Sequence, residues 1–178
     1  KRGYTREEYL NIIKDLKAAR GSVSISSDFI VGFPGESDAD FEETMALVRD
    51  VGFVQAYSFK YSPRPGTPAA DMTDQVPEHI KSVRLQELQA ELSRQQIAFN
   101  QSCIGRSLPV LFDRRGSRSG QLVGRSPYMQ SVHVDLPDSY LGEMMTVKID
   151  EAKPSSLTGV VVEKIDRASQ MPRQEAVA

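Results

Sequence analysis

The stretch IVGFPGE, which ends at Glu36, combines residue types that can line a binding pocket. Gly32 and Gly35 carry no side chain, so a flat ligand can approach their backbone closely. Ile30 and Phe33 offer apolar or stacking surface, and Glu36 can accept hydrogen bonds from a polar ligand or from its own loop. The stretch contains neither G-K-[ST] nor G-x-G-x-x-G, which excludes a Walker loop and a dinucleotide-binding fingerprint. A tight turn between a strand and a helix explains the same residues without a ligand, and both interpretations stay open.

A second group of aromatic and basic side chains falls in YSFKYSPRPGTPAA, which begins at Tyr57. Tyr57, Phe59 and Tyr61 alternate with polar residues, so a strand here has one aromatic face. Such a row is more often a core face than a binding surface, and we expect it to be buried. Lys60 and Arg64 stand near the end of this strand, where each can meet a carboxylate or phosphate or remain a solvated charge.

Arginines cluster in the C-terminal third of the chain. Five of them, with Asp113 as the one acid between the first and the last, are Arg106, Arg114, Arg115, Arg118 and Arg125. Arginine binds RNA phosphates, and the rings of Tyr128 and His133 can stack on an unpaired base. For a single arginine a solvated surface charge is the simpler explanation, and for each ring a place in the core or on a strand. Taken together, the cluster predicts an RNA-binding surface.

The composition narrows the class of protein. No apolar run reaches the roughly 18 residues that a membrane helix needs, so we expect no membrane partner and a cytoplasmic location. The formal net charge of −2 excludes a globally basic nucleic-acid coat but allows a local basic patch. The single cysteine, Cys103, excludes an internal disulfide framework and an all-cysteine metal site made by this chain alone. The chain begins at Lys1 on KRGYT, which resembles the end of an element and suggests a fragment.

The sequence up to about residue 76 predicts alternating helices and strands. Thr5 opens T-R-E-E, a capping box that starts a helix, and Gly21 ends it. VSISSDFIVGF predicts a largely buried strand. Ser37 caps a second helix that ends at Gly52, and FVQAYSFKYS is a second strand. Short connections between helix, strand, helix and strand indicate parallel βα units.

The remaining sequence predicts one long helix and a small barrel. Residues 77–101 form an amphipathic connecting helix, whose predicted apolar stripe is Ile80, Val83, Leu88, Leu92 and Ile97. Residues 102–164 contain five short strand-like runs separated by Gly, Pro, Ser and Asp, which is typical of a small antiparallel barrel. Residues 165–178 lack periodicity, and we expect a disordered tail.

Four stretches together carry a family resemblance: KRGYTREEY, SSDFIVGFPGE-x3-DFEET, SFKYSPRPGTPAA-x3-DQVPE and QLVGRS. They closely resemble the MiaB family of radical S-adenosylmethionine (SAM) tRNA methylthiotransferases. The resemblance implies that residues 1–76 are the C-terminal βα units of a partial TIM-like barrel, an α/β fold. It also implies that residues 102–164 are a TRAM domain, an all-β RNA-binding barrel.

The resemblance also implies an activity. Such enzymes add a 2-methylthio group to isopentenylated adenosine beside the tRNA anticodon, with SAM as radical source and methyl donor. Their partners are the anticodon stem-loop of tRNA, a reductant and a sulfur source. They hold two [4Fe–4S] clusters with cysteines, one set spaced C-x3-C-x2-C, and this chain contains neither set. The chain by itself is therefore expected to be inactive.

The resemblance assigns candidate residues to the SAM pocket. Radical SAM barrels commonly line the adenine with a G-x-I-x-G-x-x-E-like element on the fifth strand. The matching candidates here are Ile30, Gly32 and Phe33 as the adenine wall, Gly35 and Glu36 as loop support, Ser27 and Asp28 at the pocket mouth, Arg2 toward the ribose or carboxylate, and Phe59 and Tyr61 toward adenine or substrate. This sequence departs from that element at two places, because Asp28 replaces its leading glycine and Glu36 falls one residue late.

Two alternatives remain. Because the cluster-binding cysteines are absent, the chain can be a stand-alone RNA-binding protein without catalysis. A sister family performs the same chemistry on an aspartate of a ribosomal protein, but its stretch matching YSPRPGTPAA differs, which favours the tRNA enzymes.

Overall fold

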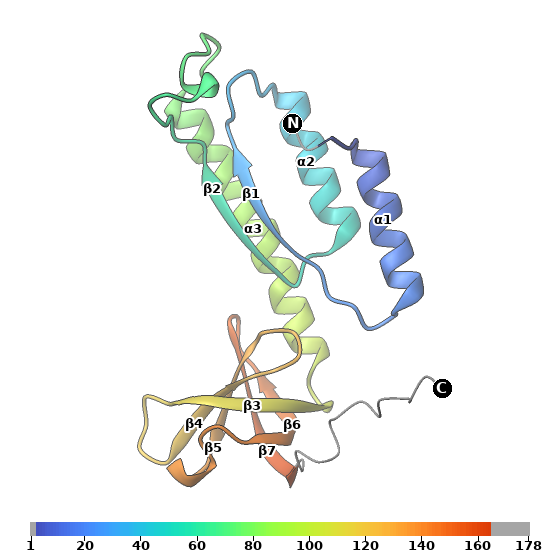
Figure 1. Cartoon of the computed structure of the whole chain (residues 1–178), viewed down its shortest axis with the longest axis vertical. Coiled ribbons are helices and arrows are strands. Elements are labelled where there is room, and N and C mark those ends of the chain that lie inside the picture. Colours follow the sequence, from blue (N-terminus) through green and yellow to red (C-terminus); the bar gives the residue numbers. More distant parts are fainter. Residues whose placement is uncertain (1–2, 165–178) are drawn as a thin grey trace, which may run out of the picture. The chain divides into compact units, whose positions relative to one another are not determined.

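The computed structural model describes residues 3–164. The chain divides into two compact units, residues 1–96 and residues 97–178, and each is described by itself (Figure 1). Arg2, predicted to contact SAM, and the tail predicted at 165–178 lie outside the described residues. The domain boundaries given above stay predictions.

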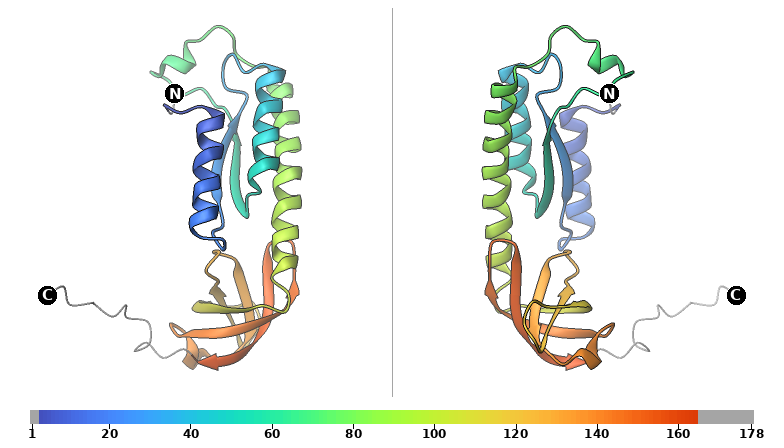
Figure 2. Two further views of the ribbon diagram at one scale, coloured as in Figure 1. Left: turned by 90° about the vertical axis from the view of Figure 1, so that its right-hand side faces the viewer. Right: turned by 90° about the vertical axis from the view of Figure 1, so that its left-hand side faces the viewer.

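The first unit contains a parallel pair of strands with helices before, between and after them. Its elements are α1 (Arg6–Ala19), β1 (Ser26–Val31), α2 (Asp38–Val51), β2 (Gln55–Lys60), the 3-10 turn η1 (Pro68–Ala70) and most of α3 (Glu78–Ser102). β1 and β2 pair in parallel, from Ser26 opposite Gln55 to Val31 opposite Lys60. Figures 1 and 2 show α2 and α3 running beside the two strands. The predicted alternation of helix and strand is confirmed.

Both helix starts in this unit carry the local interactions that the sequence predicts. The Glu8 N–H donates to the Thr5 hydroxyl at 3.2 Å, and the Thr5 N–H donates to the Glu8 carboxylate at 2.6 Å. Ser37 and Asp40 form the same reciprocal pair at 3.2 and 2.9 Å. These bonds satisfy backbone donors that the first helical turn leaves without partners, and they fix where α1 and α2 begin.

Only one face of the β1–β2 sheet is buried. Phe29 and Val31 of β1 pack against α2, in a core that also includes Leu88 and Leu92 of α3. On the other face Ile30, Tyr57 and Phe59 are 60%, 59% and 54% exposed. The prediction of a largely buried β1 is therefore half wrong, and the prediction that Tyr57 and Phe59 belong to the core is wrong. The physical reason is that no helix of the described residues covers the second face.

The buried stripe of α3 differs from the predicted one. Leu88 and Leu92 are buried as expected, but Val83 is 58% exposed. Lys81 and Arg84 are buried instead, because their aliphatic stems cover the first unit while their charged groups find partners. α3 is 25 residues long but rich in charges, and no helix within residues 3–164 is long and apolar enough to cross a membrane.

The second unit is a closed five-stranded barrel. Its strands are β3 (Ser107–Arg115), β4 (Gln121–Arg125), β5 (Ser131–Asp135), β6 (Met144–Ala152) and β7 (Ser156–Lys164), in the order β3-β4-β5-β7-β6, with the 3-10 turn η2 (Asp138–Tyr140) between β5 and β6. Its core includes Phe112, Leu122, Val132, Ile149 and Leu157, all fully buried. The five strands predicted from the sequence are confirmed.

One pair of neighbouring strands, β5 and β7, is parallel. The expectation of a fully antiparallel barrel is therefore wrong at this pair. Strand directions cannot alternate around a closed ring with an odd number of members, so a five-stranded barrel requires at least one parallel pair.

Gly124 on β4 shows how tightly the barrel closes. A Cβ added there would lie 2.5 Å from the Val110 side chain and 2.6 Å from the Leu111 carbonyl oxygen. A side chain at this position would push β3 and β4 apart. The glycine of the QLVGRS stretch is thus explained by close packing of two strands.

Candidate functional site

The loop between β1 and α2 is held by the largely buried carboxylate of Glu36. The Gly32 N–H donates to both carboxylate oxygens of Glu36, each at 2.9 Å. Arg84 of α3 donates from Nη1 to Glu36 Oε1 at 2.7 Å and to the Glu36 carbonyl oxygen at 3.1 Å, and from Nη2 to Asp38 at 2.6 Å. The Glu36 and Arg84 side chains are only 13% and 7% exposed. This group of Gly32, Glu36, Asp38 and Arg84 is called the Glu36 clamp below.

The two glycines of the loop are packed against neighbouring residues. Both have positive φ, +72° at Gly32 and +81° at Gly35, which favours glycine over other residues. A Cβ on Gly32 would collide with the stem of Lys81, and one on Gly35 would lie 2.5 Å from the Asp74 carboxylate. The Gly35 N–H also donates to the Asp74 carbonyl oxygen at 2.9 Å. On these sides the bare backbone accommodates α3 and the segment before it, and a ligand can approach only from another side.

Several predicted pocket residues share the uncovered face of the first unit. Ile30 lies opposite Phe59 in the register of β1 and β2. The ring of Phe33, 47% exposed, meets the ring of Tyr61 edge-to-face at 5.2 Å. The Tyr61 hydroxyl is buried and has no hydrogen-bond partner within the described part of the chain. Ile30, Phe33, Phe59 and Tyr61, with the neighbouring Tyr57, are called the apolar strand face below.

Lys81 reaches this end of the strands from α3. Its ammonium group lies 5.5 Å from the centre of the Tyr61 ring and 3.4 Å from the Tyr61 carbonyl oxygen. Lys60 donates to Glu78, and this bond holds the pKa of the Glu78 carboxyl below its usual value. Lys60 is therefore engaged by Glu78 of α3, whereas Lys81 makes longer contacts, among them 3.8 Å to the same carboxylate.

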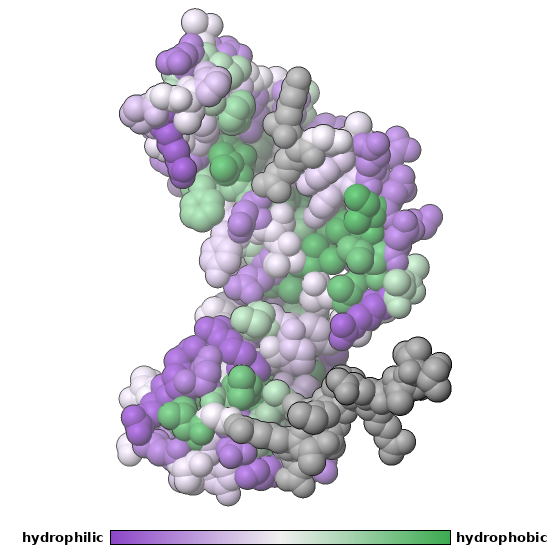
Figure 3. Space-filling model, viewed as in Figure 1, coloured by the Kyte–Doolittle hydropathy of each residue, from purple (hydrophilic) through white to green (hydrophobic). Residues whose placement is uncertain are grey.

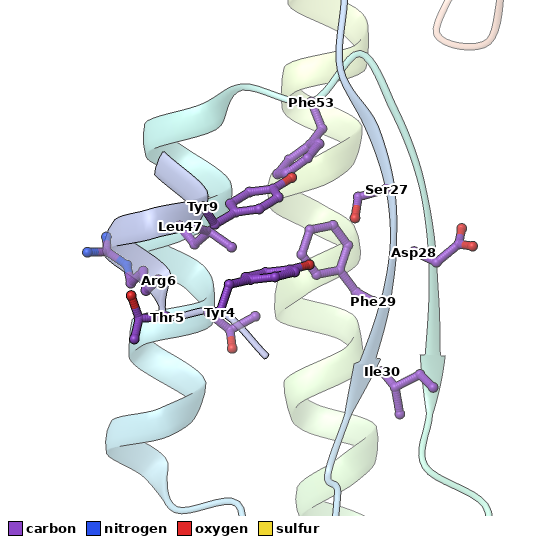
Figure 4. A pocket seen from close by; sticks show the side chains of 11 residues that line it. Tyr4, Thr5, Arg6, Tyr9, Ser27, Asp28, Phe29, Ile30, Leu47 and Phe53 are labelled. Carbon is purple, nitrogen blue, oxygen red and sulfur yellow. The ribbon is translucent and has the colours of Figure 1, made fainter. Parts of the chain in front are cut away.

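A cavity of about 430 Å³ opens beside β1 on the side away from β2 (Figure 4). The rings of Tyr4, Tyr9, Phe29 and Phe53 and the side chain of Leu47 gather around it. Figure 3 shows apolar surface over this region of the first unit, between α1 and β1. The cavity lies where β1 has a strand edge without a partner strand among the described residues.

Ser27 and Asp28, predicted at a pocket mouth, both belong to the lining of this cavity. They come from neighbouring positions of β1, so their side chains point to opposite faces, and in Figure 4 Asp28 points away from the rings. The structure therefore does not bring Ser27 and Asp28 together at one face.

The barrel arginines fall into two kinds by their partners. Arg115 donates to Asp138 at 2.7 Å and Arg118 to Asp135 at 3.3 Å, in exposed ion pairs. Arg106 instead donates to the Tyr128 hydroxyl at 2.8 Å and lies 5.5 Å from the centre of that ring. The structure thus places Tyr128 beneath an arginine.

Arg114 and Arg125 converge on one serine. Arg114 donates to the Ser131 hydroxyl at 3.2 Å and Arg125 at 3.3 Å. Asp113 lies between them, 3.4 Å from Arg114 and 3.7 Å from Arg125. Because the side chains of Asp113, Arg114 and Arg125 are more than one-third exposed, these ion pairs are weak and an RNA phosphate can compete with Asp113.

His133 of β5 lies among positive charges. Desolvation lowers the pKa of His133 below its usual value, and the nearby charges of Lys153, Arg114 and Arg118 lower it further. The lowered pKa favours the neutral ring, which can stack on a base. Lys153 extends the basic surface, and sequence analysis missed it because it lies in the β6–β7 turn, far from the arginines along the chain.

No group of three or more His, Cys, Asp or Glu side chains within residues 3–164 could hold a metal ion. Cys103 is fully buried in the barrel core, with its sulfur 3.6 Å from the Gln130 side-chain nitrogen. Cys103 is therefore a core residue of the barrel.

Two family models match the chain. The TRAM domain model matches residues 101–162, the region of the five-stranded barrel, and the Radical SAM superfamily model matches residues 1–48. The first unit therefore carries a radical SAM match, and the closed barrel is consistent with a TRAM domain.

The similar proteins carry one name. The chain is 57% identical over 162 residues to the tRNA-2-methylthio-N(6)-dimethylallyladenosine synthase of Rickettsia rickettsii. It is 56% identical over 161 residues to the synthase of Rickettsia canadensis and 56% identical over 162 residues to that of Rickettsia prowazekii. Each alignment covers 90% of this chain but 36% of the relative, so the chain spans about a third of their length. The resemblance to the radical SAM tRNA methylthiotransferases is confirmed, and the chain is a relative of this family along nearly its whole length.

Proposed function

We propose that the chain is the C-terminal part of a radical SAM methylthiotransferase that modifies isopentenylated adenosine beside the tRNA anticodon. The observation that carries the proposal is the 57% identity to a named synthase along 90% of the chain, which spans the radical SAM and TRAM matches together. A stand-alone RNA-binding protein does not explain why the identity extends through the first unit. A ribosomal protein substrate is not favoured by the names of these relatives.

We further propose that residues 1–76 are later βα units of a partial TIM-like barrel. The parallel pairing of β1 and β2, with α2 as crossover, supports this fold. So does the unpaired edge of β1 beside the 430 Å³ cavity, where a further parallel strand would complete the wall. In such a barrel the apolar strand face would line the interior, since the helices pack on the other face.

SAM fits the residues of the apolar strand face. The flat aromatic faces of its adenine suit apolar contact, and Ile30, Phe33 and Phe59 present exposed apolar surface near the carboxyl ends of parallel strands, where such folds bind ligands. Tyr61 adds a buried hydroxyl that has no hydrogen-bond partner within residues 3–164. When bound, SAM would supply the radical and the methyl group. Iron–sulfur clusters do not fit this chain, because each requires three cysteines and the chain has one.

The chain's own residues would bind and orient rather than react. Glu36 would hold the Gly32–Gly35 loop in one conformation through the Glu36 clamp, so that Phe33 and Ile30 meet adenine at a fixed distance. The predicted contact of Arg2 with SAM stays a proposal, as do the reductant, the sulfur source and the cytoplasmic location.

The barrel arginines would hold the tRNA. We propose that Arg106, Arg114 and Arg125 contact phosphates of the anticodon stem-loop, together with Lys153. Arg115 would have to leave Asp138, and Arg118 would have to leave Asp135, to bind phosphate. Breaking these ion pairs costs little free energy because both are exposed.

The experiment is RNA binding by the whole chain at several salt concentrations. The double substitution Arg114→Ala and Arg118→Ala should weaken binding of a tRNA anticodon stem-loop and reduce the slope of log affinity against log salt by about one to two. Arg94→Ala is the matched control, because Arg94 is an exposed arginine paired with Glu91 on α3. Unchanged RNA affinity of the double variant would show that Arg114 and Arg118 do not contact RNA. Binding by neither the variant nor the native chain would refute the RNA-binding role of this barrel.

A further inference from the structure

The β4–β5 loop carries an exposed apolar side chain that phosphate binding does not explain. Met129, in the segment 126–130, is 60% exposed. It has a φ of +63° and is the only residue other than glycine with positive φ in the described part of the chain. Unlike asparagine or aspartate, methionine gains no local side-chain hydrogen bond there. Backbone strain kept at an exposed apolar residue indicates a role for that residue beyond folding.

The base of this loop is held by several hydrogen bonds. Ser126 is 3% exposed, its N–H donates to the Gln130 carbonyl oxygen at 3.1 Å, and its hydroxyl accepts from the Tyr128 N–H at 3.2 Å. The Gln130 side chain in turn donates to Asn100 at 2.6 Å. The Met129 N–H donates to the Ser126 carbonyl oxygen at 3.0 Å. The side chain of Met129 is therefore presented from a fixed backbone.

Two arginines contact residues of this loop. Arg125 donates to the Met129 carbonyl oxygen at 3.1 Å. Arg106 binds the hydroxyl of the preceding Tyr128 at 2.8 Å. The nearest acid of these contacts is Asp113, 3.7 Å from Arg125 in an exposed pair. Positive charge around an apolar tip matches a nucleotide, which has negative phosphate beside an apolar base face.

We propose that Met129 contacts the face of an unpaired RNA base, while Arg106 and Arg125 hold the adjoining phosphates. The thioether is polarisable and packs well on aromatic faces. In a duplex both faces of a base are covered by stacking, so the contact requires a single-stranded loop or a displaced base. This inference rests on the proposed RNA binding and adds to it the part of the RNA that the barrel distinguishes.

The test compares three RNAs of equal charge with the whole chain, by fluorescence anisotropy: a hairpin with an unpaired loop, the same hairpin with abasic loop positions, and a blunt duplex. The native chain should bind the first most tightly. Met129→Gly, which relieves the positive φ, should weaken hairpin binding about five- to tenfold and leave binding of the other two RNAs unchanged. Met129→Leu keeps an apolar side chain and should retain most of the preference.

The control variant is Val160→Ala, since Val160 is 53% exposed on β7, a strand without arginine. Its RNA affinities should equal those of the native chain. If Met129→Gly binds the hairpin as tightly as the native chain does, the proposed base contact is wrong. It is also wrong if the variant loses the same factor in affinity for all three RNAs. If the native chain binds all three equally with strong salt dependence, the inference fails while RNA binding stands. If it binds none, both fail.

Discussion

The two units of the chain leave opposite kinds of surface open to solvent. The barrel closes around an apolar core and turns its arginines and their acidic partners outward. In the first unit Arg84 of α3 is buried and Glu36 largely so, while the apolar strand residues Ile30, Tyr57 and Phe59 are exposed.

The difference follows from strand number. Five strands around a ring have no free edge, and the barrel satisfies its backbone groups by itself. Two strands have two free edges and one uncovered face, and such a pair gains stability only from packing against helices. The loop after β1 is therefore fixed by an ion pair from α3, and the uncovered face is left for a ligand or further strands.

The largest expected effect contrasts the two kinds of apolar residue. Phe112→Ala removes a fully buried ring from the barrel core and should destabilise the second unit by about 3–5 kcal/mol. Ile30→Ala changes a residue that is 60% exposed and should change the stability of the first unit by less than about 0.5 kcal/mol. Denaturant unfolding followed by amide hydrogen exchange reports each unit separately. A loss above 2 kcal/mol at Ile30 would mean that the apolar strand face is covered, contrary to the structure.

The next effect contrasts a buried ion pair with an exposed one. Arg84→Ala removes the cation from the largely buried Glu36 carboxylate, which keeps the Gly32 N–H bond, and should destabilise the first unit by about 3 kcal/mol. Arg118→Ala breaks an ion pair whose side chains are 68% and 78% exposed, and should cost less than about 1 kcal/mol.

The Gly32 amide distinguishes loss of the Glu36 clamp from general destabilisation. In Arg84→Ala this amide should exchange faster than those of the α2 core, whereas Arg84→Lys should restore part of its protection. Uniform acceleration across the first unit would show that Arg84 contributes packing and does not hold the loop.

Sequence patterns predicted what depends on neighbours along the chain. The capping boxes at Thr5 and Ser37 and the five barrel strands follow from local residue types and periodicity. The Glu36 clamp does not, because Arg84 lies 48 residues from Glu36 and a helical stripe of apolar residues gives no reason to bury an arginine. The exposure of the aromatic face was also unpredictable, since alternation shows that a strand has two faces but not which of them is covered.

The residues of the candidate sites also fall into some that the sequence predicted and others that it did not. The basic cluster was visible because its arginines lie within 20 residues of Arg106 in sequence. Lys81 and Lys153 were not, because each reaches its neighbours only after the chain folds back. The strained conformation of Met129 had no signal in the sequence, since methionine rarely adopts positive φ.

The smallest effect concerns His133, which faces Lys153, Arg114 and Arg118. Its pKa is lower in the folded chain than the ordinary value of about 6.5 that it has when unfolded. Above pH 7 both states are neutral at this ring and it contributes nothing to pH dependence. As the pH falls through about 6.5 the unfolded state takes up the proton first, so the barrel loses stability, and the loss stops growing below the folded pKa.

RNA phosphates should offset the three cations, raise the pKa of His133 and strengthen RNA binding about threefold between pH 7.5 and 6. NMR titration of the His133 ring with and without RNA measures this, with His79 of the first unit as internal control. If RNA leaves the His133 titration unchanged while the arginine variants weaken binding, the RNA surface excludes β5 and is confined to the β3–β4 side of the barrel.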